Sequence, residues 1–297
     1  MTTFENRFSS TISDAQGNSY IVNSVVNTNE GSFGVGYMAW NYPYVCNKTF
    51  GLVMNFDNEQ ITFAYKYEAS VPYLLFQKVI NLPNGNLKVR GSLTHSYDSF
   101  ALASPYSEPV LQKAVPFTVE MTPQGKIVDA FSLNITDFMG QDIVATPDGG
   151  SITIDLYRTS LANGFVPFRT LITMFDNSTV LQQSIRKNQI GSITAGINDQ
   201  NNLLLNGNVG LGNNAGTEEV SIATGESLSL QYPVCSGDAN FNVLAMNVTS
   251  NMQQFVGSYQ QSQLALIQYD TNHQLKNIFT YTHPSAPIAF LAAQYSR

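Results

Sequence analysis

Residues 77–93 read QKVINLPNGNLKVRGSL, which is two β-rich runs on either side of an Asn-Gly turn at 84–85. Residues 117–131 read FTVEMTPQGKIVDAF and repeat that plan around a Pro-Gln-Gly turn at 123–125. Apolar runs of this length that flank a turn rich in Asn, Pro and Gly are typical of a β-hairpin. Two hairpins in succession therefore predict one four-stranded antiparallel sheet.

The rest of the chain carries the same plan. Eight further segments place two β-rich runs around a tip that contains Asn, Asp or Gly. They are residues 10–26, 53–67, 141–157, 170–185, 192–209, 220–232, 233–248 and 264–279. No extended run has the apolar spacing and the capping residues of a helix, so the sequence predicts an all-β chain.

Repetition of this kind favours a radial fold. A four-stranded unit with two apolar faces cannot bury both alone, whereas units stacked around an axis cover each other's faces. We therefore predict a single β-propeller over residues 1–297, with about five four-stranded antiparallel blades. The predicted blades are approximately 7–68, 76–132, 140–187, 190–232 and 233–297. A β-sandwich with accidental hairpin similarity is the alternative.

The two ends of the chain are predicted to close the ring. The apolar run IAFLAAQ at 288–294 has no partner hairpin of its own, and the hairpin that begins the chain lacks a neighbour on one side. Pairing between these N- and C-terminal strands would cover both edges. Residues 28–50, 94–114, 161–168 and 208–217 are expected to be loops that join the hairpins.

The composition of the chain limits the classes of partner that it can bind. Only 12% of its residues are charged, the formal net charge is -7 and the sequence pI is about 4.9. A polar surface must therefore come from Asn, Gln, Ser, Thr and Tyr, which suits an extracellular, virion or carbohydrate-facing protein. Scattered Lys and Arg give no basic face for nucleic acid, and no apolar run is long enough for a membrane span. The first ten residues do not predict a conventional signal peptide, so a cytoplasmic protein or export by another route stays open.

One short motif resembles a known repeat. Residues 14–22 read DAQGNSYIV, and residues 82–87 and 146–150 share part of this pattern. The segment resembles the opening hairpin of bacterial β-propeller repeats of the SBBP type. That resemblance implies a propeller fold, and propellers with similar repeats include lectins, surface proteins and scaffolds. It implies no catalytic set that could be transferred to this chain.

Most motifs of catalysis and metal binding are missing from the sequence. There is no G-x-S-x-G elbow, no phosphate-binding loop and no H-E-x-x-H. His95, His273 and His283 are too few and too far apart in sequence to predict a metal site, and no cofactor is expected. Cys46 and Cys235 could form one disulfide or remain two buried thiols, and the sequence leaves both open.

Carboxylates are the remaining option for catalysis. Asp98, Asp142, Asp155 and Asp238 are candidates, and Asp155 stands out because it interrupts the apolar run SITIDLY. Five-bladed propellers include glycoside hydrolases that place carboxylates around the axial funnel, one as acid and another as nucleophile or base. The alternative, which we favour, is that Asp155 faces solvent or a backbone donor of a neighbouring blade.

Aromatic residues indicate a binding function instead. The expected loop at 28–50 contains the aromatic and amide side chains that stack on sugars and bind their hydroxyls. The candidate ligand-binding residues there are Tyr37, Trp40, Asn41, Tyr42 and Tyr44. The alternative is that the loop folds back and buries its own rings.

The leading functional hypothesis is a non-catalytic binding or scaffold propeller that recognises a carbohydrate or protein partner. A virion component, such as a phage tail or receptor-binding protein, is one form of it. The alternatives are a glycoside hydrolase that uses funnel carboxylates and a purely structural assembly subunit.

Overall fold

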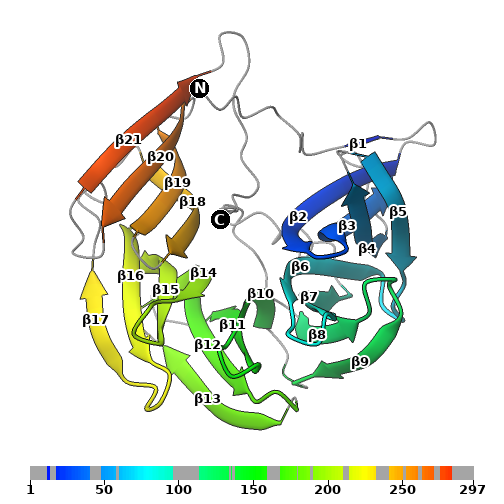
Figure 1. Cartoon of the computed structure of the whole chain (residues 1–297), viewed down its shortest axis with the longest axis horizontal. Helices are drawn as coiled ribbons and strands as arrows, with labels where there is room; N and C mark the ends of the chain where they lie inside the picture. The colour runs from blue at the N-terminus through cyan, green and yellow to red at the C-terminus, as the bar shows by residue number, and fades with distance from the viewer. Residues whose placement is uncertain are drawn as a thin grey trace. The chain divides into compact units, whose positions relative to one another are not determined.

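The computed structural model describes residues 12–13, 18–40, 48–57, 60–95, 114–133, 135, 138–158, 168–178, 180–187, 190–209, 214–231, 241–249, 252–259, 263–270 and 275–282. Every regular element in these ranges is a β-strand (Figure 1). The strands form five antiparallel sheets that follow one another along the chain. The prediction of an all-β fold built from four-stranded antiparallel sheets is confirmed.

The first two sheets lie between Ile12 and Ser132. The first sheet consists of β1 (Ile12–Ser13), β2 (Asn18–Thr28), β3 (Gly31–Trp40), β4 (Thr49–Asp57) and β5 (Gln60–Tyr67). The second sheet consists of β6 (Tyr73–Asn81), β7 (Leu87–Thr94), β8 (Val115–Met121) and β9 (Ile127–Ser132).

The other three sheets have four strands each. The third sheet consists of β10 (Phe138–Ala145), β11 (Ser151–Arg158), β12 (Phe168–Phe175) and β13 (Leu181–Lys187). The fourth consists of β14 (Ile190–Ile197), β15 (Asn202–Val209), β16 (Asn214–Ser221) and β17 (Ser227–Gln231). The fifth consists of β18 (Phe241–Thr249), β19 (Met252–Tyr259), β20 (Gln263–Asp270) and β21 (Leu275–Thr282). The chain divides into two compact units, Met1–Ala145 and Thr146–Arg297, which are described separately below.

A single turn design recurs between strands. In the turn between β6 and β7, the Leu82 amide donates to the Asn86 carbonyl at 2.8 Å, and the Gly85 amide donates to the Leu82 carbonyl at 2.9 Å. The same pair of bonds recurs in the turns at 122–126 and 146–150. The glycine of each turn has a φ between +80° and +88°, a left-handed conformation that glycine adopts without steric cost. The repeated Pro-x-Gly sequence therefore fixes these hairpins locally.

The first strand of a sheet carries a β-bulge near its middle. In four sheets, one extra residue interrupts the register between two adjacent strands (β2 and β3 in the first sheet, and the first and second strands in the other three), and the residue before it pairs with a glycine. Below, β2 is counted as the first full-length strand of its sheet. The extra residues are Asn23, Gln77, Ile193 and Leu244, and the facing glycines are Gly36, Gly91, Gly207 and Gly257. A Cβ on Gly91 would lie 2.3 Å from the Leu75 carbonyl oxygen, so the bulge brings two backbones too close for any larger residue.

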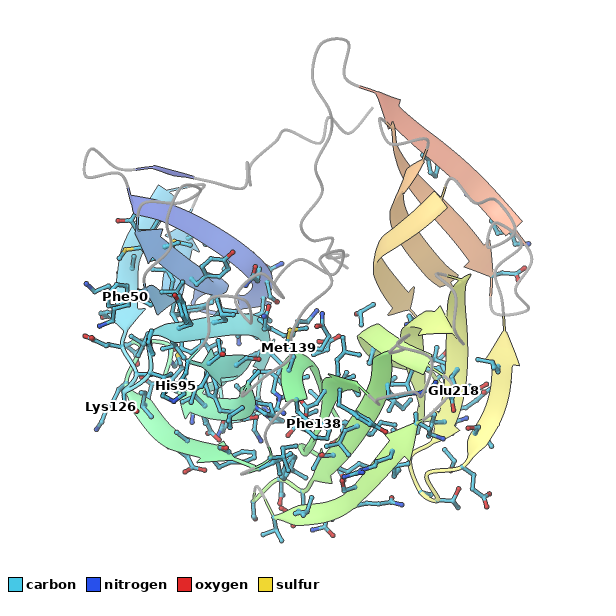
Figure 2. The ribbon with its side chains drawn as sticks, turned by 180° about the vertical axis from the view of Figure 1, so that it is seen from behind. Phe50, His95, Lys126, Phe138, Met139 and Glu218 are labelled. Atoms are coloured by element: carbon cyan, nitrogen blue, oxygen red, sulfur yellow. The ribbon has the colours of Figure 1, made fainter. Side chains whose placement is uncertain are left out.

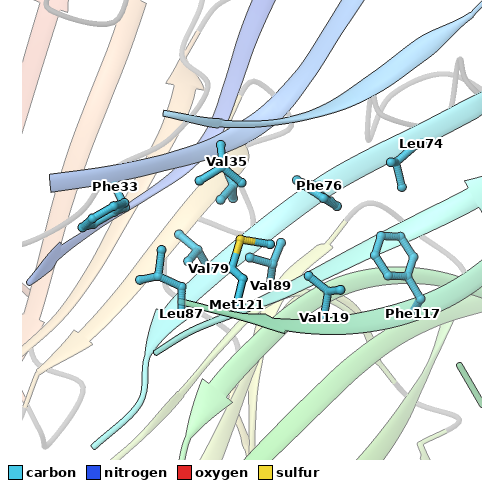
Figure 3. Close-up of a cluster of buried hydrophobic side chains, with 11 residues drawn as sticks. Phe33, Val35, Leu74, Phe76, Val79, Leu87, Val89, Phe117, Val119 and Met121 are labelled. Atoms are coloured by element: carbon cyan, nitrogen blue, oxygen red, sulfur yellow. The ribbon is translucent and has the colours of Figure 1, made fainter. Parts of the chain in front are cut away.

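In the first unit, the first two sheets share an apolar core (Figure 3). Residues from β3 and β4 pack against residues of β6, β7 and β8. The buried cluster consists of Phe33, Val35, Val53, Leu74, Phe76, Val79, Leu87, Val89, Phe117, Val119 and Met121. We call this boundary the first seam. Phe76 and Phe117 meet in it with ring centroids 5.9 Å apart.

The opposite face of the second sheet is polar and also buried. Arg90 is fully buried and donates to the Thr118 hydroxyl at 2.8 Å. Strand β10 packs on this face, where the Gly140 amide donates to the Ser92 hydroxyl at 3.0 Å. A Cβ on Gly140 would lie 2.5 Å from the Gly91 carbonyl oxygen, so glycine allows this close approach. β10 is thereby held against β7.

In the second unit, β11 and β12 share a core with the fourth sheet. This cluster is aliphatic and consists of Ile152, Ile154, Ile172, Met174, Leu203, Leu205 and Val220. We call this boundary the second seam. Glu218 (Figure 2) pairs with Leu205 in the register and is 1% exposed. A carboxylate is therefore buried at the edge of this apolar cluster.

Each seam is also bridged by one polar contact of the same kind. In the first seam, the Tyr67 hydroxyl of β5 donates to the Gly125 carbonyl oxygen at 2.5 Å. In the second, the Lys187 ammonium of β13 donates to the Gly225 carbonyl oxygen at 3.0 Å. Both acceptors are the glycine of the turn that precedes the last strand of the following sheet. We call these contacts the seam latches.

The structure corrects several expected loops and one hairpin. Residues 28–50 are not a single loop, because β3 occupies Gly31–Trp40 and pairs with both β2 and β4. Residues 208–217 are largely strand, since β15 ends at Val209 and β16 begins at Asn214. The partner of β18 is β19, so the hairpin expected at 233–248 is wrong in its second half. The predicted closing strand at 288–294 lies outside the described residues.

Candidate functional site

The sheet repeat places Lys78 and Asp142 at equivalent positions. Lys78 precedes the turn residue Leu82 by the same number of residues as Asp142 precedes Thr146, and the two turns have identical hydrogen bonding. By the same count, Gln77 corresponds to Gln141. The dipeptides Gln-Lys and Gln-Asp thus stand at the same spacing before the two turns, and in β6 the glutamine of this dipeptide is the bulge residue.

The bulge positions differ in chemistry between the two units. The first unit has the amides Asn23, Gln77 and, by the repeat, Gln141 at these positions. The second unit has Ile193 and Leu244 there, with the same bulge and the same facing glycine. Because the backbone accepts aliphatic residues at this position, the bulge itself does not require polar side chains. Bulges are common beside functional sites, where they direct a side chain.

The polar bulge residues of the first unit are close in space. Strand β6 contacts both β2 and β10. The Asn23 amide nitrogen donates to the Phe76 carbonyl oxygen at 2.7 Å and lies 3.5 Å from Gln77 Oε1. Asn23, Gln77 and Gln141 are all half-buried. We call Asn23, Gln77, Lys78, Gln141 and Asp142 the bulge cluster.

An ion pair completes the cluster. Lys78 Nζ lies 3.8 Å from Asp142 Oδ1, and the two side chains are 39% and 3% exposed. Asp142 Oδ1 also accepts a hydrogen bond from the Ile143 amide at 2.8 Å. The carboxylate is therefore held inside, whereas part of the ammonium faces outward.

The cluster consists mainly of hydrogen-bond donors and acceptors. Its primary amides can both donate and accept, and the Lys78 ammonium donates. It contains neither the thiol or imidazole of an activated nucleophile nor a group of metal ligands. Across the described part of the chain, no group of three or more His, Cys, Asp and Glu side chains could hold a metal ion. This chemistry suits the recognition of hydroxyl or amide groups.

The predicted aromatic site is only partly within the described residues. Tyr37 lies in β3, is 6% exposed and packs with Ala39, Tyr73 and Leu75. Trp40 is the last residue of β3, with its backbone opposite Asn18. Asn41, Tyr42 and Tyr44 lie outside the described residues. The structure therefore assigns Tyr37 to packing, and the ligand role of the other four remains a prediction.

The candidate carboxylates are dispersed. Asp142 belongs to the bulge cluster of the first unit, and Asp155 is fully buried in β11 of the second. By the turn repeat, Asp155 occupies the position at which β7 and β15 have Gly91 and Gly207. Asp98 and Asp238 lie outside the described residues. Of the two alternatives expected for Asp155, burial excludes solvent, and a backbone donor of a neighbouring blade stays a prediction.

The sequence reasoning missed four members of the bulge cluster: Asn23, Gln77, Lys78 and Gln141. A signal for part of it was present, since Gln77-Lys78 and Gln141-Asp142 stand at the same spacing before similar turns. The spacing alone could not show that these residues lie at bulges. That required the register of the strands.

Comparison with known proteins identifies the fold and no family. No family model matches the chain, and no curated protein matches it. Among solved structures, it is similar to hydrazine synthase from Kuenenia stuttgartiensis, at 10% identity and a TM-score of 0.52, over 88% of this chain and 66% of that one. It is similar to an exo-β-1,3-galactanase from Phanerochaete chrysosporium in complex with galactose, at 12% identity and a TM-score of 0.51, over 92% and 67%. It is also similar to the Dos1 propeller, at 13% identity and a TM-score of 0.50, over 92% and 65%.

The chain has a β-propeller fold. It spans about two thirds of the length of these solved neighbours. Since they include enzymes as well as the Dos1 propeller, the likeness shows the fold and does not select an activity. Within the described ranges, there is no helix long and apolar enough to cross a membrane.

Proposed function

We propose that this chain is a non-catalytic propeller that binds a carbohydrate through the bulge cluster of its first unit. The observation that carries the proposal is the polarity of the bulge positions. The same backbone site holds Asn and Gln in the first unit and Ile and Leu in the second. Asn23 also joins the first sheet to the second through its bond to the Phe76 carbonyl oxygen, and the remaining amide groups at these half-buried positions are available to a ligand. Half-buried amides are well suited to sugar hydroxyls, which both donate and accept.

The arrangement of carboxylates supports binding over hydrolysis. A glycoside hydrolase requires two carboxyl groups that face one glycosidic bond. The described first strands β2, β6, β10, β14 and β18 together contain one carboxylate, Asp142, which is buried and paired with Lys78. The similarity to a galactanase is a similarity of fold at 12% identity and transfers no catalytic residue.

We further propose an extracellular or virion location for this function. The low content of charged residues and the abundance of Asn and Gln support it. So does the resemblance of residues 14–22 to SBBP-type repeats, which occur in surface proteins. A purely structural role in an assembly would leave the polar bulge positions unexplained.

A glycan array tests the proposal directly, followed by titration calorimetry with the best ligand. Asn23→Ala and Gln77→Ala should each weaken binding about three- to tenfold, which is the loss of one or two net hydrogen bonds. Asn84→Ala, which removes an exposed turn amide of the same sheet, is the matched control and should bind as the wild type does.

Two outcomes would contradict carbohydrate binding at this site. An array without signal, combined with capture of a defined protein partner that Gln77→Ala abolishes, would make the cluster a protein-binding site. Hydrolysis of an array glycan that Asp142→Asn abolishes would make the chain an enzyme.

A further inference from the structure

Asn23 contacts both the side chain of Gln77 and the backbone of the strand that carries it. We infer that Asn23 is a positioning residue, which fixes the Gln77 side chain so that its Nε2 group is the donor offered to the ligand. The inference rests on the proposed function, and it separates the roles of two amides that the proposed function treats alike.

The backbone of β6 does not fix Gln77 by strand pairing. Phe76 and Lys78 pair with residues of β7, and Gln77 between them does not, because it is the extra residue of the bulge. A bulge turns its extra residue out of the regular alternation of the strand. The half-buried Gln77 side chain therefore needs a contact from another strand if it is to hold one orientation.

Asn23 provides that contact from the neighbouring sheet. Its Nδ2 group donates to the Phe76 carbonyl oxygen at 2.7 Å, directly before the bulge residue, and lies 3.5 Å from Gln77 Oε1. A flipped Asn23 amide would place Oδ1 against the Phe76 carbonyl oxygen, so this bond also determines which group faces Gln77. Gln77 Oε1 is the acceptor beside this donor, which leaves Gln77 Nε2 for another partner.

Neighbouring first strands of the second unit pack without such a bond. There β14 contacts β18, and the bulge residue of β14 is Ile193, which has no hydrogen-bonding side chain. In the first unit, a separate bond also joins β2 to β6, because the Val79 amide donates to the Ser24 hydroxyl at 3.4 Å. The Asn23 amide thus adds to this boundary a contact with Gln77.

A double-mutant cycle tests the inference, by titration calorimetry with the glycan that gives the strongest array signal. Asn23→Ala and Gln77→Ala should each weaken its binding about three- to tenfold. The double variant should bind within about twofold of Gln77→Ala, because Asn23 acts through Gln77. Ser24→Ala is the matched control, since it removes another side-chain bond between β2 and β6 and should bind as the wild type does.

Two further measurements do not depend on that cycle. In proton–nitrogen NMR spectra of the free protein, Asn23→Ala should lower the heteronuclear NOE of the Gln77 side-chain amide, and Ser24→Ala should leave it unchanged. Gln77→Glu leaves Asn23 in place, keeps the acceptor and removes the Nε2 donor. It should therefore weaken glycan binding at least as much as Gln77→Ala does.

Four results would overturn the inference. They are losses of affinity that add in the double variant, an Asn23→Ala variant that binds like Ser24→Ala, an unchanged NOE of Gln77 in Asn23→Ala, and a Gln77→Glu variant that binds as the wild type does. None of them would remove carbohydrate binding itself. Absence of all glycan binding would overturn the proposed function, and the NOE of Gln77 would still decide whether Asn23 positions it.

Discussion

The two seams have the same backbone plan and opposite chemistry. In each, the last strand of one sheet reaches the glycine carbonyl of a turn in the next sheet. The first seam does this with the neutral hydroxyl of Tyr67, and the second with the ammonium of Lys187. In the second, Lys187 also pairs with Glu218 at 3.2 Å and donates to the Ser227 hydroxyl at 2.8 Å. A repeat fold thus fixes where a contact is made and leaves open which side chain makes it.

The side chain that forms each latch suits the composition of the core beside it. The first seam is rich in aromatic rings, and Tyr67 itself lies with its ring centroid 5.6 Å from that of Phe76. The second seam is aliphatic and has no described aromatic ring in its core cluster. A tyrosine brings both apolar area and a hydroxyl, whereas a lysine brings a charge that must be neutralised when buried. The second seam therefore needs Glu218, and the first needs no counter-ion.

The largest expected effect comes from removing the buried cation. Lys187→Met leaves Glu218 buried without its partner and should lower the free energy of unfolding by about 3–5 kcal/mol. Urea unfolding followed by circular dichroism measures this. Lys126→Met, at an exposed turn, should leave the midpoint unchanged.

A double variant sharpens this result. Replacing both charges, as in Lys187→Met with Glu218→Leu, should restore most of the lost stability, since apolar residues often replace a buried ion pair without penalty. If the double variant is as unstable as Lys187→Met, the loss comes from packing and the latch is not electrostatic.

Substitutions of the turn glycines distinguish the cost of backbone strain from the cost of steric contact across a seam. Gly85, Gly125 and Gly225 all have positive φ, but a Cβ on Gly85 would meet nothing within 4 Å. Gly85→Ala should cost only the left-handed strain of about 1–2 kcal/mol. Gly125→Ala and Gly225→Ala should cost more, because the new Cβ would lie 2.2 Å from Tyr65 and 2.4 Å from Ile185. Equal thermal stability of the three variants would show that neither seam is tight at its latch.

The stability that the Tyr67 latch contributes should depend on pH. Burial, with a smaller contribution from the nearby Tyr65, raises the pKa of Tyr67 from its ordinary 10.0 to about 12. Between pH 10 and 12 the unfolded chain releases this proton and the folded chain retains it, so stability falls as the pH rises through this window. Tyr67→Phe should cost about 1 kcal/mol at pH 8 and should lose this part of the alkaline decline. Urea midpoints at pH 8 and pH 11 test both statements, and an unchanged decline in the variant would contradict them.

The smallest effect is expected from an exposed ion pair near the first seam. Lys48 contacts Glu68, and its hydrogen bond and charge hold the pKa of that carboxyl below its ordinary value. Lys48→Gln should raise the Glu68 pKa in a carboxyl NMR titration and leave the unfolding midpoint unchanged, because water screens the pair. A clear loss of stability would remove the contrast with the buried pair of Lys187 and Glu218.

Most of the fold could be predicted from the sequence, and most of the candidate site could not. The turns at 82–86, 122–126 and 146–150 are encoded locally, because proline presets φ and glycine permits the left-handed conformation. Strand β3 was missed because residues 31–40 contain three glycines, a residue that is depleted in strands. Its strand conformation comes from pairing with β2 and β4 and is not a local preference.

The sequence by itself determined where the chain turns, and with it the division into successive antiparallel sheets. Only the tertiary structure decided that Asn23 and Gln77 are bulge residues, that Asp142 lies beside Lys78, and that Lys187 and Glu218 are buried together. The physical reason is the range of the interactions. A turn depends on the dihedral angles of a few consecutive residues, whereas a bulge or a buried ion pair depends on the register and packing of strands that are distant along the chain.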